Sequence, residues 1–171
     1  RTGESCVRDC STRMAAANHN FYLSEFYGAN KLASGEMVMA GARLDMKKVK
    51  LPVFELATRE DHIAPAESVF TGSKTLGGPV EFVLTGSGHI AGVINPPAAG
   101  KYNHWTNDDL PETPDKWFEG ATDHKGSWWP DWEQWLSEKS GGLVPARKPG
   151  SGKLKVLEDA PGSYVLVKSE D

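Results

Sequence analysis

The sequence lacks the features that mark membrane, secreted or nucleic-acid-binding proteins. Only two of its 171 residues are cysteine, and no signal peptide precedes the first periodic segment. No apolar run approaches the roughly 20 residues that a membrane-spanning helix needs. The formal net charge is −4, and no local basic patch is present to attract nucleic acid. Internal repeats and long low-complexity tracts are also missing. These absences predict a soluble cytoplasmic protein without a nucleic-acid partner or a membrane span.

The cysteines and the first residues of the chain carry no recognisable site. Three residues separate Cys6 from Cys10, a spacing that matches neither a zinc-binding pair nor a disulfide framework, so we interpret both as ordinary thiols. The length suits one globular domain or a large part of one. The chain begins at Arg1 rather than at methionine, and the first regular pattern follows Ser11. We therefore expect a fragment or a processed product.

Aromatic and apolar residues recur at helical spacing near the start of the chain. Ser11-Thr12 is a plausible N-cap, and the pattern predicts a helix over residues 11–32. A helix packed on a core or covering a cleft explains this face better than a cofactor site. Tyr22, Tyr27 and Asn30 remain secondary candidates for a functional site.

The stretch after this helix predicts only local structure. Residues 37–44 read as a short hairpin or an extended connection. Lys47, Lys48 and Lys50 follow, and we interpret them as a solvated run of charge. Neither segment suggests chemistry.

Two polar loops each follow a short apolar run of strand length. Residues 52–58 form the first run, and a polar cluster containing Asp61 follows directly. Pro65 suits the first turn of a helix, after which residues 80–84 form the second run and a loop presents His89. This order is the crossover unit of a parallel sheet, in which both loops leave at the same edge. We therefore expect Asp61 and His89 to be neighbours.

The loop around His89 has the composition of a constrained turn. Gly86 and Gly88 permit backbone angles closed to other residues, and Pro96-Pro97 stops regular structure soon afterwards. In open α/β sheets, catalytic groups often lie at the carboxyl ends of strands. An acid and then a histidine, each after a late parallel strand, is the order that ends the triad of α/β-hydrolases.

The chemistry of such a pair is general-base catalysis. A histidine takes a proton from a nucleophile at neutral pH, while a carboxylate on its other nitrogen fixes the tautomer. A structural hydrogen bond explains either residue equally well. A metal site built from Asp61, His62 and His89 is a further alternative, but a catalytic zinc site also needs supporting groups. His62 is a weaker candidate, because adjacent side chains of an extended segment point apart.

Three longer motifs of the sequence resemble, in their order and spacing, those of class I polyhydroxyalkanoate synthases. They are REDHI at residues 59–63, GSGHIAGVINPP at residues 86–97 and GSWWPDW at residues 126–132. Shorter motifs extend the resemblance over most of the chain: DCSTRM at residues 9–14, FYL at residues 21–23 and NKL at residues 30–32. The resemblance implies the C-terminal portion of an α/β-hydrolase fold, with late parallel strands and flanking helices.

The same resemblance implies a function. It indicates a bacterial cytoplasmic enzyme, a homodimer when full length, that polymerises hydroxyacyl-CoA thioesters on the surface of polyester granules without a metal or a resident cofactor. In that family a cysteine in a Gly-x-Cys-x-Gly turn is the nucleophile. The histidine matching His89 activates this thiol. The aspartate matching Asp61 serves either the histidine or the incoming hydroxyl, and the sequence leaves both roles open.

The chain departs from the family pattern at the nucleophile. Cys6 is flanked two residues away by Glu4 and Arg8, and Cys10 by Arg8 and Thr12, so neither lies in a glycine-flanked turn. Neither cysteine follows a strand, as the turn requires. We therefore expect the C-terminal part of a synthase, inactive alone. A non-catalytic granule-surface or synthase-binding module and a different esterase are the alternatives.

The remaining segments support this placement without adding chemistry. The tryptophans from Trp128 to Trp135 recur at helical spacing and suggest core packing more than a ligand platform. His104 and His124 have no acid at a catalytic spacing and are interpreted as surface or capping residues. The expected organisation is a catalytic body over residues 1–139, with residues 11–32 at the end of the cap region. A flexible connector over residues 140–152 and a terminal β-hairpin over residues 153–171 follow.

Overall fold

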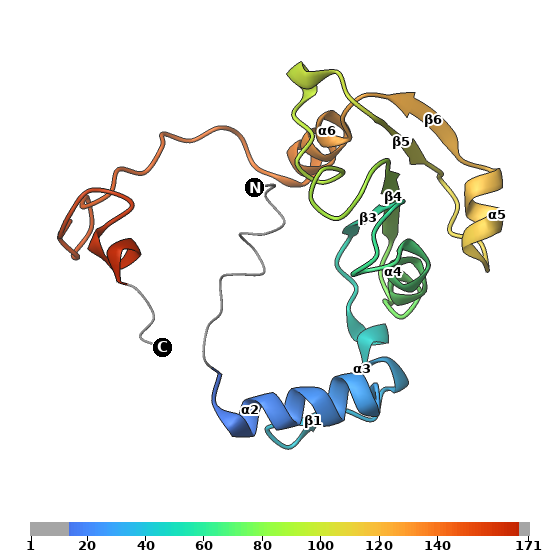
Figure 1. Ribbon diagram of the computed structural model, residues 1–171, viewed down its shortest axis with the longest axis horizontal. Coiled ribbons are helices and arrows are strands. Elements are labelled where there is room, and N and C mark those ends of the chain that lie inside the picture. Colours follow the sequence, from blue (N-terminus) through green and yellow to red (C-terminus); the bar gives the residue numbers. More distant parts are fainter. Residues whose placement is uncertain (1–13, 168–171) are drawn as a thin grey trace. The chain divides into compact units, whose positions relative to one another are not determined.

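The computed structural model describes residues 14–167 of the chain (Figure 1). These residues fall into two compact units, which divide between Glu138 and Lys139. Cys6, Cys10 and the predicted cap Ser11-Thr12 lie outside the described residues. Among the residues that are described, no helix is both long enough and apolar enough to cross a membrane.

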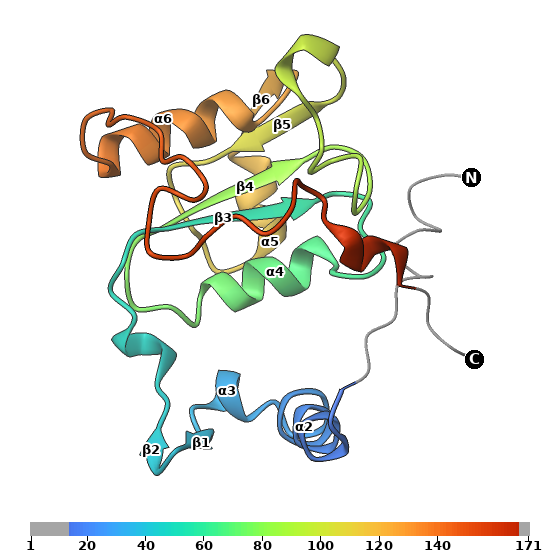
Figure 2. The same ribbon diagram turned by 90° about the vertical axis from the view of Figure 1, so that its left-hand side faces the viewer.

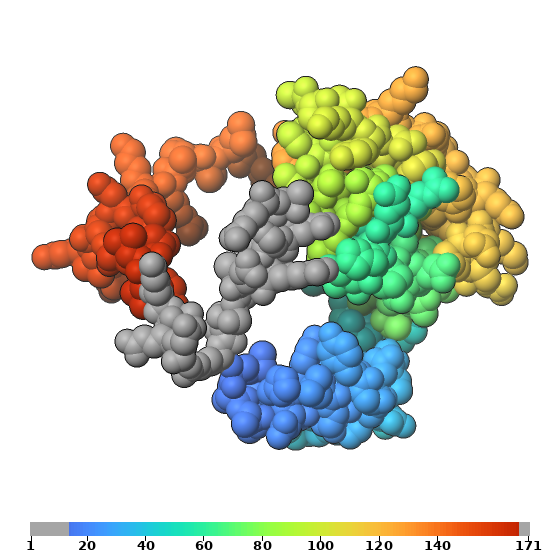
Figure 3. Space-filling view, in the orientation of Figure 1, coloured from blue at the N-terminus to red at the C-terminus, as the bar shows by residue number. Residues whose placement is uncertain are grey.

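The first unit begins with a segmented helix instead of the single helix predicted over residues 11–32. Helix α2 (Ala16–Phe21) continues as a π-helix (Tyr22–Gly28), and the short helix α3 (Lys31–Ser34) follows. Asn30 interrupts them with a left-handed backbone, at a φ of 44°. Most side chains of this segment, blue in Figure 3, are exposed, and Tyr27 is 74% exposed.

A small hairpin follows, as expected for residues 37–44. Strands β1 (Val38–Met39) and β2 (Ala42–Arg43) pair antiparallel. The two turn residues between them, Ala40 and Gly41, both have positive φ, at 47° and 77°. Positive φ at both central residues matches the type I′ turn, whose twist suits two adjacent antiparallel strands.

The main sheet has four strands in the order β3-β4-β5-β6. Strand β3 (Val53–Thr58) pairs in parallel with β4 (Val80–Thr85), so the predicted parallel unit is confirmed. Strands β5 (Asn103–Thr106) and β6 (Thr122–Lys125) then add to the sheet antiparallel, an extension that the sequence analysis did not predict. The chain is therefore α/β with a mixed sheet, and β3 lies at one edge of it.

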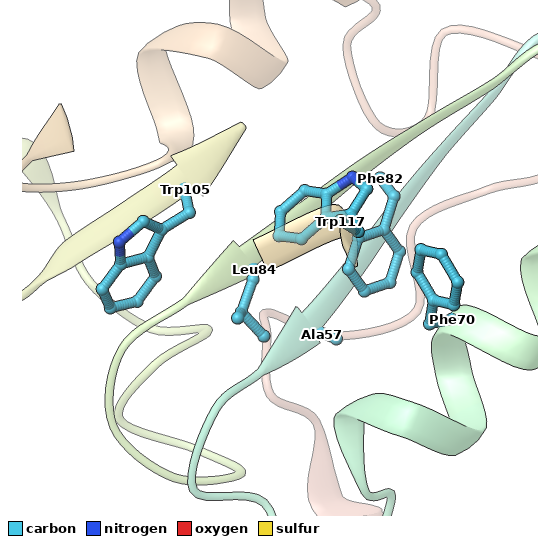
Figure 4. Packing of buried hydrophobic residues seen from close by; sticks show 6 residues of the cluster. All are labelled: Ala57, Phe70, Phe82, Leu84, Trp105 and Trp117. Carbon is cyan, nitrogen blue, oxygen red and sulfur yellow. The ribbon is translucent and has the colours of Figure 1, made fainter. Parts of the chain in front are cut away.

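Helices cover both faces of this sheet. Helix α4 (Ala66–Ser73) and helix α6 (Trp129–Lys139) lie on opposite faces, as Figure 2 shows. Helix α5 (Pro114–Glu119) joins α4 around one core, in which Phe82 and Leu84 of β4 point to the same face because side chains alternate along a strand. Figure 4 shows the six buried residues of this core: Ala57, Phe70, Phe82, Leu84, Trp105 and Trp117.

The lysines before β3 have a structural role that the sequence analysis missed. They belong to a 3₁₀ turn (Met46–Lys48) and the residues after it. Lys47 Nζ donates to the carbonyl oxygen of Lys74 at 2.6 Å, and Lys50 Nζ donates to that of Gly77 at 3.1 Å. These carbonyls follow the last turn of α4, where backbone acceptors have no partner within the helix. All three lysines are exposed, as predicted for a solvated run of charge, and two of them also bind backbone carbonyls.

The second unit contains no terminal hairpin in its described part. Residues 153–167 form no strand, and their one regular element is a 3₁₀ turn (Ser163–Leu166). An isolated two-stranded hairpin is only marginally stable, and the alternating apolar residues on which that prediction rested remain exposed. They include Leu154 at 85%, Leu157 at 95% and Tyr164 at 83%. The predicted hairpin over residues 153–171 is therefore wrong for the part that is described.

Candidate active site

Asp61 and His89 lie together at the carboxyl ends of β3 and β4. The two strands are parallel and in register, with Thr58 opposite Thr85, so the loop after each strand leaves at the same edge of the sheet (Figure 1). His89 Nδ1 lies 2.8 Å from Asp61 Oδ2. The order of strands and loops in the sequence predicted that these two residues are neighbours, and the structure places them in contact.

The carboxylate of Asp61 is enclosed by hydrogen bonds. Its Oδ1 accepts from the backbone N–H of Ile63 at 2.8 Å and of Ala64 at 2.9 Å. Its Oδ2 accepts from Thr58 Oγ1 at 3.2 Å and contacts His89 at 2.8 Å. The side chain is only 6% exposed. A carboxylate has about four acceptor positions, two on each oxygen, and all four are used here.

These contacts keep Asp61 ionised. Burial on its own raises the pKa of a carboxyl, but the hydrogen bonds from Ala64, His89 and Ile63 outweigh it and lower the pKa of Asp61 to about 2. A carboxylate only accepts hydrogen bonds, so His89 Nδ1 must carry the proton that it shares. Nε2 is then the basic nitrogen of the ring, on a side chain that is 40% exposed.

Backbone bonds hold the two loops against each other. The Arg59 N–H donates to the Thr85 carbonyl at 2.8 Å, and the Glu60 N–H donates to the Ser87 carbonyl at 3.0 Å. Both continue the pairing of β3 with β4 by two residues beyond the strands. The register of the sheet is thereby carried into the site, and it fixes which residue of one loop faces which residue of the other.

The glycines of the His89 loop act differently from the prediction. Neither Gly86 nor Gly88 has a positive φ, and the left-handed residue is Ser87, at 73°. The close approach occurs at Gly92, where a Cβ would lie 2.7 Å from the Gly86 carbonyl oxygen and 3.1 Å from that of Gly88. Glycine is therefore required after the histidine, where the loop folds back on itself.

Two tryptophans fix the segment that follows His89. Trp128 Nε1 donates to the Gly92 carbonyl at 3.2 Å, and Trp129 Nε1 donates to the Val93 carbonyl at 2.9 Å. Sequence reasoning had treated these side chains as packing residues of a helix. The available signal was the indole N–H itself, which generally finds an acceptor when the ring is buried.

Comparison with known proteins connects this site to a family. No protein-family model matches the chain. Over 93% of its length the chain is 54% identical to the poly(3-hydroxyalkanoate) polymerase subunit PhaC of Rhizobium etli and 56% identical to the poly(3-hydroxyalkanoate) polymerase of Methylorubrum extorquens. It is 41% identical to the PhaC subunit of Cupriavidus necator over the same share. By sequence, the chain belongs to the poly(3-hydroxyalkanoate) polymerase family. It spans 25% to 27% of the length of these relatives.

The residues that the sequence suggested as secondary site candidates are not in contact with the Asp61–His89 pair in the described part of the chain. His62 is exposed in the turn after Asp61, Tyr27 belongs to the π-helix, and Asn30 begins α3. Within residues 14–167, no hydrogen bond, ion pair or ring contact joins any of them to the pair. Across the same residues, no group of three histidine, cysteine or acidic side chains is placed to hold a metal ion.

A second histidine–aspartate pair was missed by the sequence analysis. His104 is 3% exposed, its Nε2 lies 2.9 Å from Asp131 Oδ2, and its Nδ1 lies 3.2 Å from the Gly126 carbonyl. Its ring stacks on that of His124 at 5.0 Å. The interpretation of His104 as a surface or capping residue is therefore wrong, because its acid comes from another element, α6. Each ring nitrogen of His104 thus has an acceptor beside it, and the contact with Asp131 links β5 to α6.

Proposed function

We propose that this chain is the C-terminal catalytic portion of a class I polyhydroxyalkanoate synthase. The whole enzyme joins (R)-3-hydroxyacyl groups from their CoA thioesters into a polyester and releases CoA, at the surface of cytoplasmic granules. The similar polymerases of Rhizobium etli and Methylorubrum extorquens supply the reaction class. The observation that carries the catalytic assignment is the ionised, buried Asp61 that holds the His89 ring by Nδ1.

In this proposal His89 is the general base and the nucleophile is a cysteine thiol from the rest of the synthase. His89 Nε2 takes the thiol proton, and the thiolate attacks the thioester carbonyl to form an acyl-enzyme. The CoA thiolate leaves and takes the proton from Nε2 to become the free thiol. In the next step Nε2 accepts the proton of an acceptor hydroxyl, whose oxygen attacks the acyl carbonyl. The ester bond forms as the bond between the acyl group and the cysteine breaks, and the cysteine thiolate takes the proton back from Nε2. Each step returns His89 to its neutral form.

Asp61 serves the histidine in this proposal and not the incoming hydroxyl. Its four acceptor positions are filled by Thr58, Ile63, Ala64 and His89. A substrate hydroxyl would have to displace one of these donors to reach the carboxylate. A pKa of about 2 also makes the carboxylate a weak base at neutral pH. Orientation of the ring and stabilisation of the imidazolium are the roles that remain.

The nucleophile is the part that the chain does not provide, because neither cysteine lies in a Gly-x-Cys-x-Gly turn. We therefore propose that the 171 residues alone release no CoA. The edge position of β3 is consistent with a parent whose sheet continues beyond it. We further propose that the complete synthase acts as a homodimer.

A chimera tests the proposal. The chain replaces the matching 159 residues of the Rhizobium etli relative, and release of CoA from 3-hydroxybutyryl-CoA is measured. We expect the chimera to be active and its His89→Gln variant to lose the activity with the fold intact. His62→Gln is the matched control, one residue from Asp61, and should keep normal turnover. Undiminished turnover in the His89→Gln chimera would remove His89 from the mechanism.

A further inference from the structure

The buried ring of His104 faces a hydrogen-bond acceptor at each of its two nitrogens. Nε2 lies 2.9 Å from Asp131 Oδ2, and Nδ1 lies 3.2 Å from the carbonyl oxygen of Gly126. An ionised carboxylate and a carbonyl accept hydrogen bonds and donate none, whereas a neutral imidazole carries only one N–H. The neutral ring would therefore turn a lone pair toward one of the two oxygens. Only the imidazolium, with a proton on each nitrogen, donates to both.

The surroundings of His104 suit a single positive charge. Among the residues that the structure describes, the Asp131 carboxylate is the one charged group in contact with the ring. His124 stacks on the ring from β6, with centroids 5.0 Å apart. Thr106 Oγ1 lies 2.8 Å from His124 Nε2, and its hydroxyl can donate to that nitrogen when His124 is neutral. His124 thus needs no charge of its own, and two stacked imidazoliums would repel each other.

The other titratable side chains of the elements packed around His104 lie away from it. Those next to His124 on β6 occupy the opposite face of the sheet, because side chains alternate along a strand. Those of α6 either lie two residues from Asp131, a spacing that does not share a helix face, or begin two turns, about 10 Å, beyond it. On β4 the residue opposite His104 is the uncharged Thr85, and Glu81 is exposed near the other end of the strand. The side chains set apart on β6 and α6 are Asp123, Lys125, Glu133, Glu138 and Lys139.

The contact between His104 and Asp131 reaches the candidate base through the first turn of α6. Asp131 and Trp129 both belong to this turn. Trp129 Nε1 donates to the carbonyl of Val93 at 2.9 Å, and Val93 lies in the segment that directly follows His89. The position of this turn on the sheet therefore affects where the histidine loop is held.

We propose that His104 is a positioning residue for the candidate base, and that it acts as an imidazolium that ties the beginning of α6 to β5. Loss of its ring proton removes one of its two hydrogen bonds and the charge that attracts Asp131. The first turn of α6 is then held less tightly, and so is the loop that carries His89. The effect on catalysis rests on the proposed synthase function, while the protonation of His104 and its effect on α6 do not.

The pH dependence of kcat separates this role from a purely structural one. The chimera is assayed for CoA release between pH 5 and pH 9. We expect kcat to rise as His89 becomes a free base and to fall again, at alkaline pH, where His104 loses its proton. His104→Gln keeps a donor toward Asp131 but cannot titrate, so its kcat should be about tenfold lower at the optimum and show no alkaline fall. His124→Gln is the matched control and should keep that fall.

Asp131→Asn tests the charge at a more exposed position, should His104→Gln unfold. The amide oxygen still accepts from His104 Nε2 but attracts a positive ring less strongly, so the alkaline fall in kcat should move to lower pH. An alkaline fall that does not move in this variant, or one that persists in His104→Gln, would overturn the proposal. A residue that only stabilised the fold would lower kcat without changing the shape of its pH profile.

A measurement on the 171-residue chain needs no catalysis. The readouts are the ¹⁵N ring signals of His104 and the solvent exchange of the Trp129 indole N–H, followed over the same pH range by NMR. The indole of the exposed Trp132 reports the ordinary effect of pH on exchange. We expect both ring nitrogens of His104 to carry protons at the acidic end. As the ring loses a proton, exchange at Trp129 should rise about fivefold relative to Trp132. Exchange at Trp129 that does not follow the titration of His104 contradicts the proposal.

The positioning role and the synthase function fail separately. An active chimera without an alkaline fall, or a chain whose Trp129 exchange is independent of His104, leaves the synthase function standing and removes the positioning role. An inactive chimera removes the function and the positioning of a base with it. If Trp129 exchange in the chain still follows His104, only the proton-dependent attachment of α6 remains.

Discussion

Trp129 Nε1 donates a hydrogen bond of 2.9 Å to the carbonyl of Val93, four residues after His89. The indole comes from the first turn of α6, and Asp131 in the same turn contacts His104 on β5 at 2.9 Å. The beginning of α6 is thus attached both to the sheet and to the loop that presents the candidate base. Substitutions in this turn should therefore change the site without touching the substrate.

Trp129→Phe should lower the turnover number of the chimera for CoA release. The phenyl ring preserves packing but cannot donate to Val93, so the histidine loop loses one of its restraints. Small displacements of a catalytic group are costly, and we expect about a tenfold fall in kcat with little change in KM. Trp132→Phe, an exposed tryptophan of the same helix, should leave kcat unchanged. Equal effects of the two variants would mean that Trp129 contributes only general stability.

Asp61→Asn should inactivate the chimera through the tautomer of His89. The amide oxygen must stay on the N–H groups of Ile63 and Ala64, which leaves the NH₂ group facing His89 Nδ1. Nδ1 then accepts and the ring proton moves to Nε2, the nitrogen that should act as base. We expect roughly a ten-thousandfold fall in kcat. Glu60→Gln, the neighbouring acid, is the control, and a loss below tenfold for Asp61→Asn would exclude this role.

The parallel unit could be predicted from sequence because its evidence is local. Each apolar run and each polar loop is contiguous, and the crossover rule alone places Asp61 beside His89. The contacts of Trp129 with Val93 and of His104 with Asp131 join segments 27 to 36 residues apart, for which no rule of spacing exists. The prediction of a terminal hairpin was wrong because alternating apolar and polar residues indicate a strand only where another part of the protein buries one face of it.

The ionisation of Asp61 should appear in the acid stability of the chain. Its pKa falls from 3.8 to about 2 on folding, so the carboxylate stabilises the fold fully above about pH 4. This contribution is lost as the pH drops through the folded pKa near 2. Urea unfolding between pH 5 and pH 2 should therefore show a steeper loss of unfolding free energy for the wild type than for Asp61→Asn. Parallel curves for the two proteins would show that the carboxylate is not selectively stabilised by the fold.

Two glycines of the histidine loop should respond oppositely to alanine. A Cβ at Gly92 would lie 2.7 Å from the Gly86 carbonyl oxygen and 2.9 Å from Thr58 Cγ2, both in rigid parts of the site. Gly92→Ala should then destabilise the chain by about 2 kcal/mol or more, measured by urea unfolding, because the backbone must move.

Gly88→Ala is the matched control for this prediction. Its nearest neighbour would be the Glu60 carbonyl oxygen at 3.6 Å, an ordinary contact, and its φ is not positive. We expect a change within about 0.5 kcal/mol. If Gly88→Ala were the more damaging variant, the loop would depend on glycine before the histidine, as its sequence alone suggests. The fold-back at Gly92 would then not be what constrains His89.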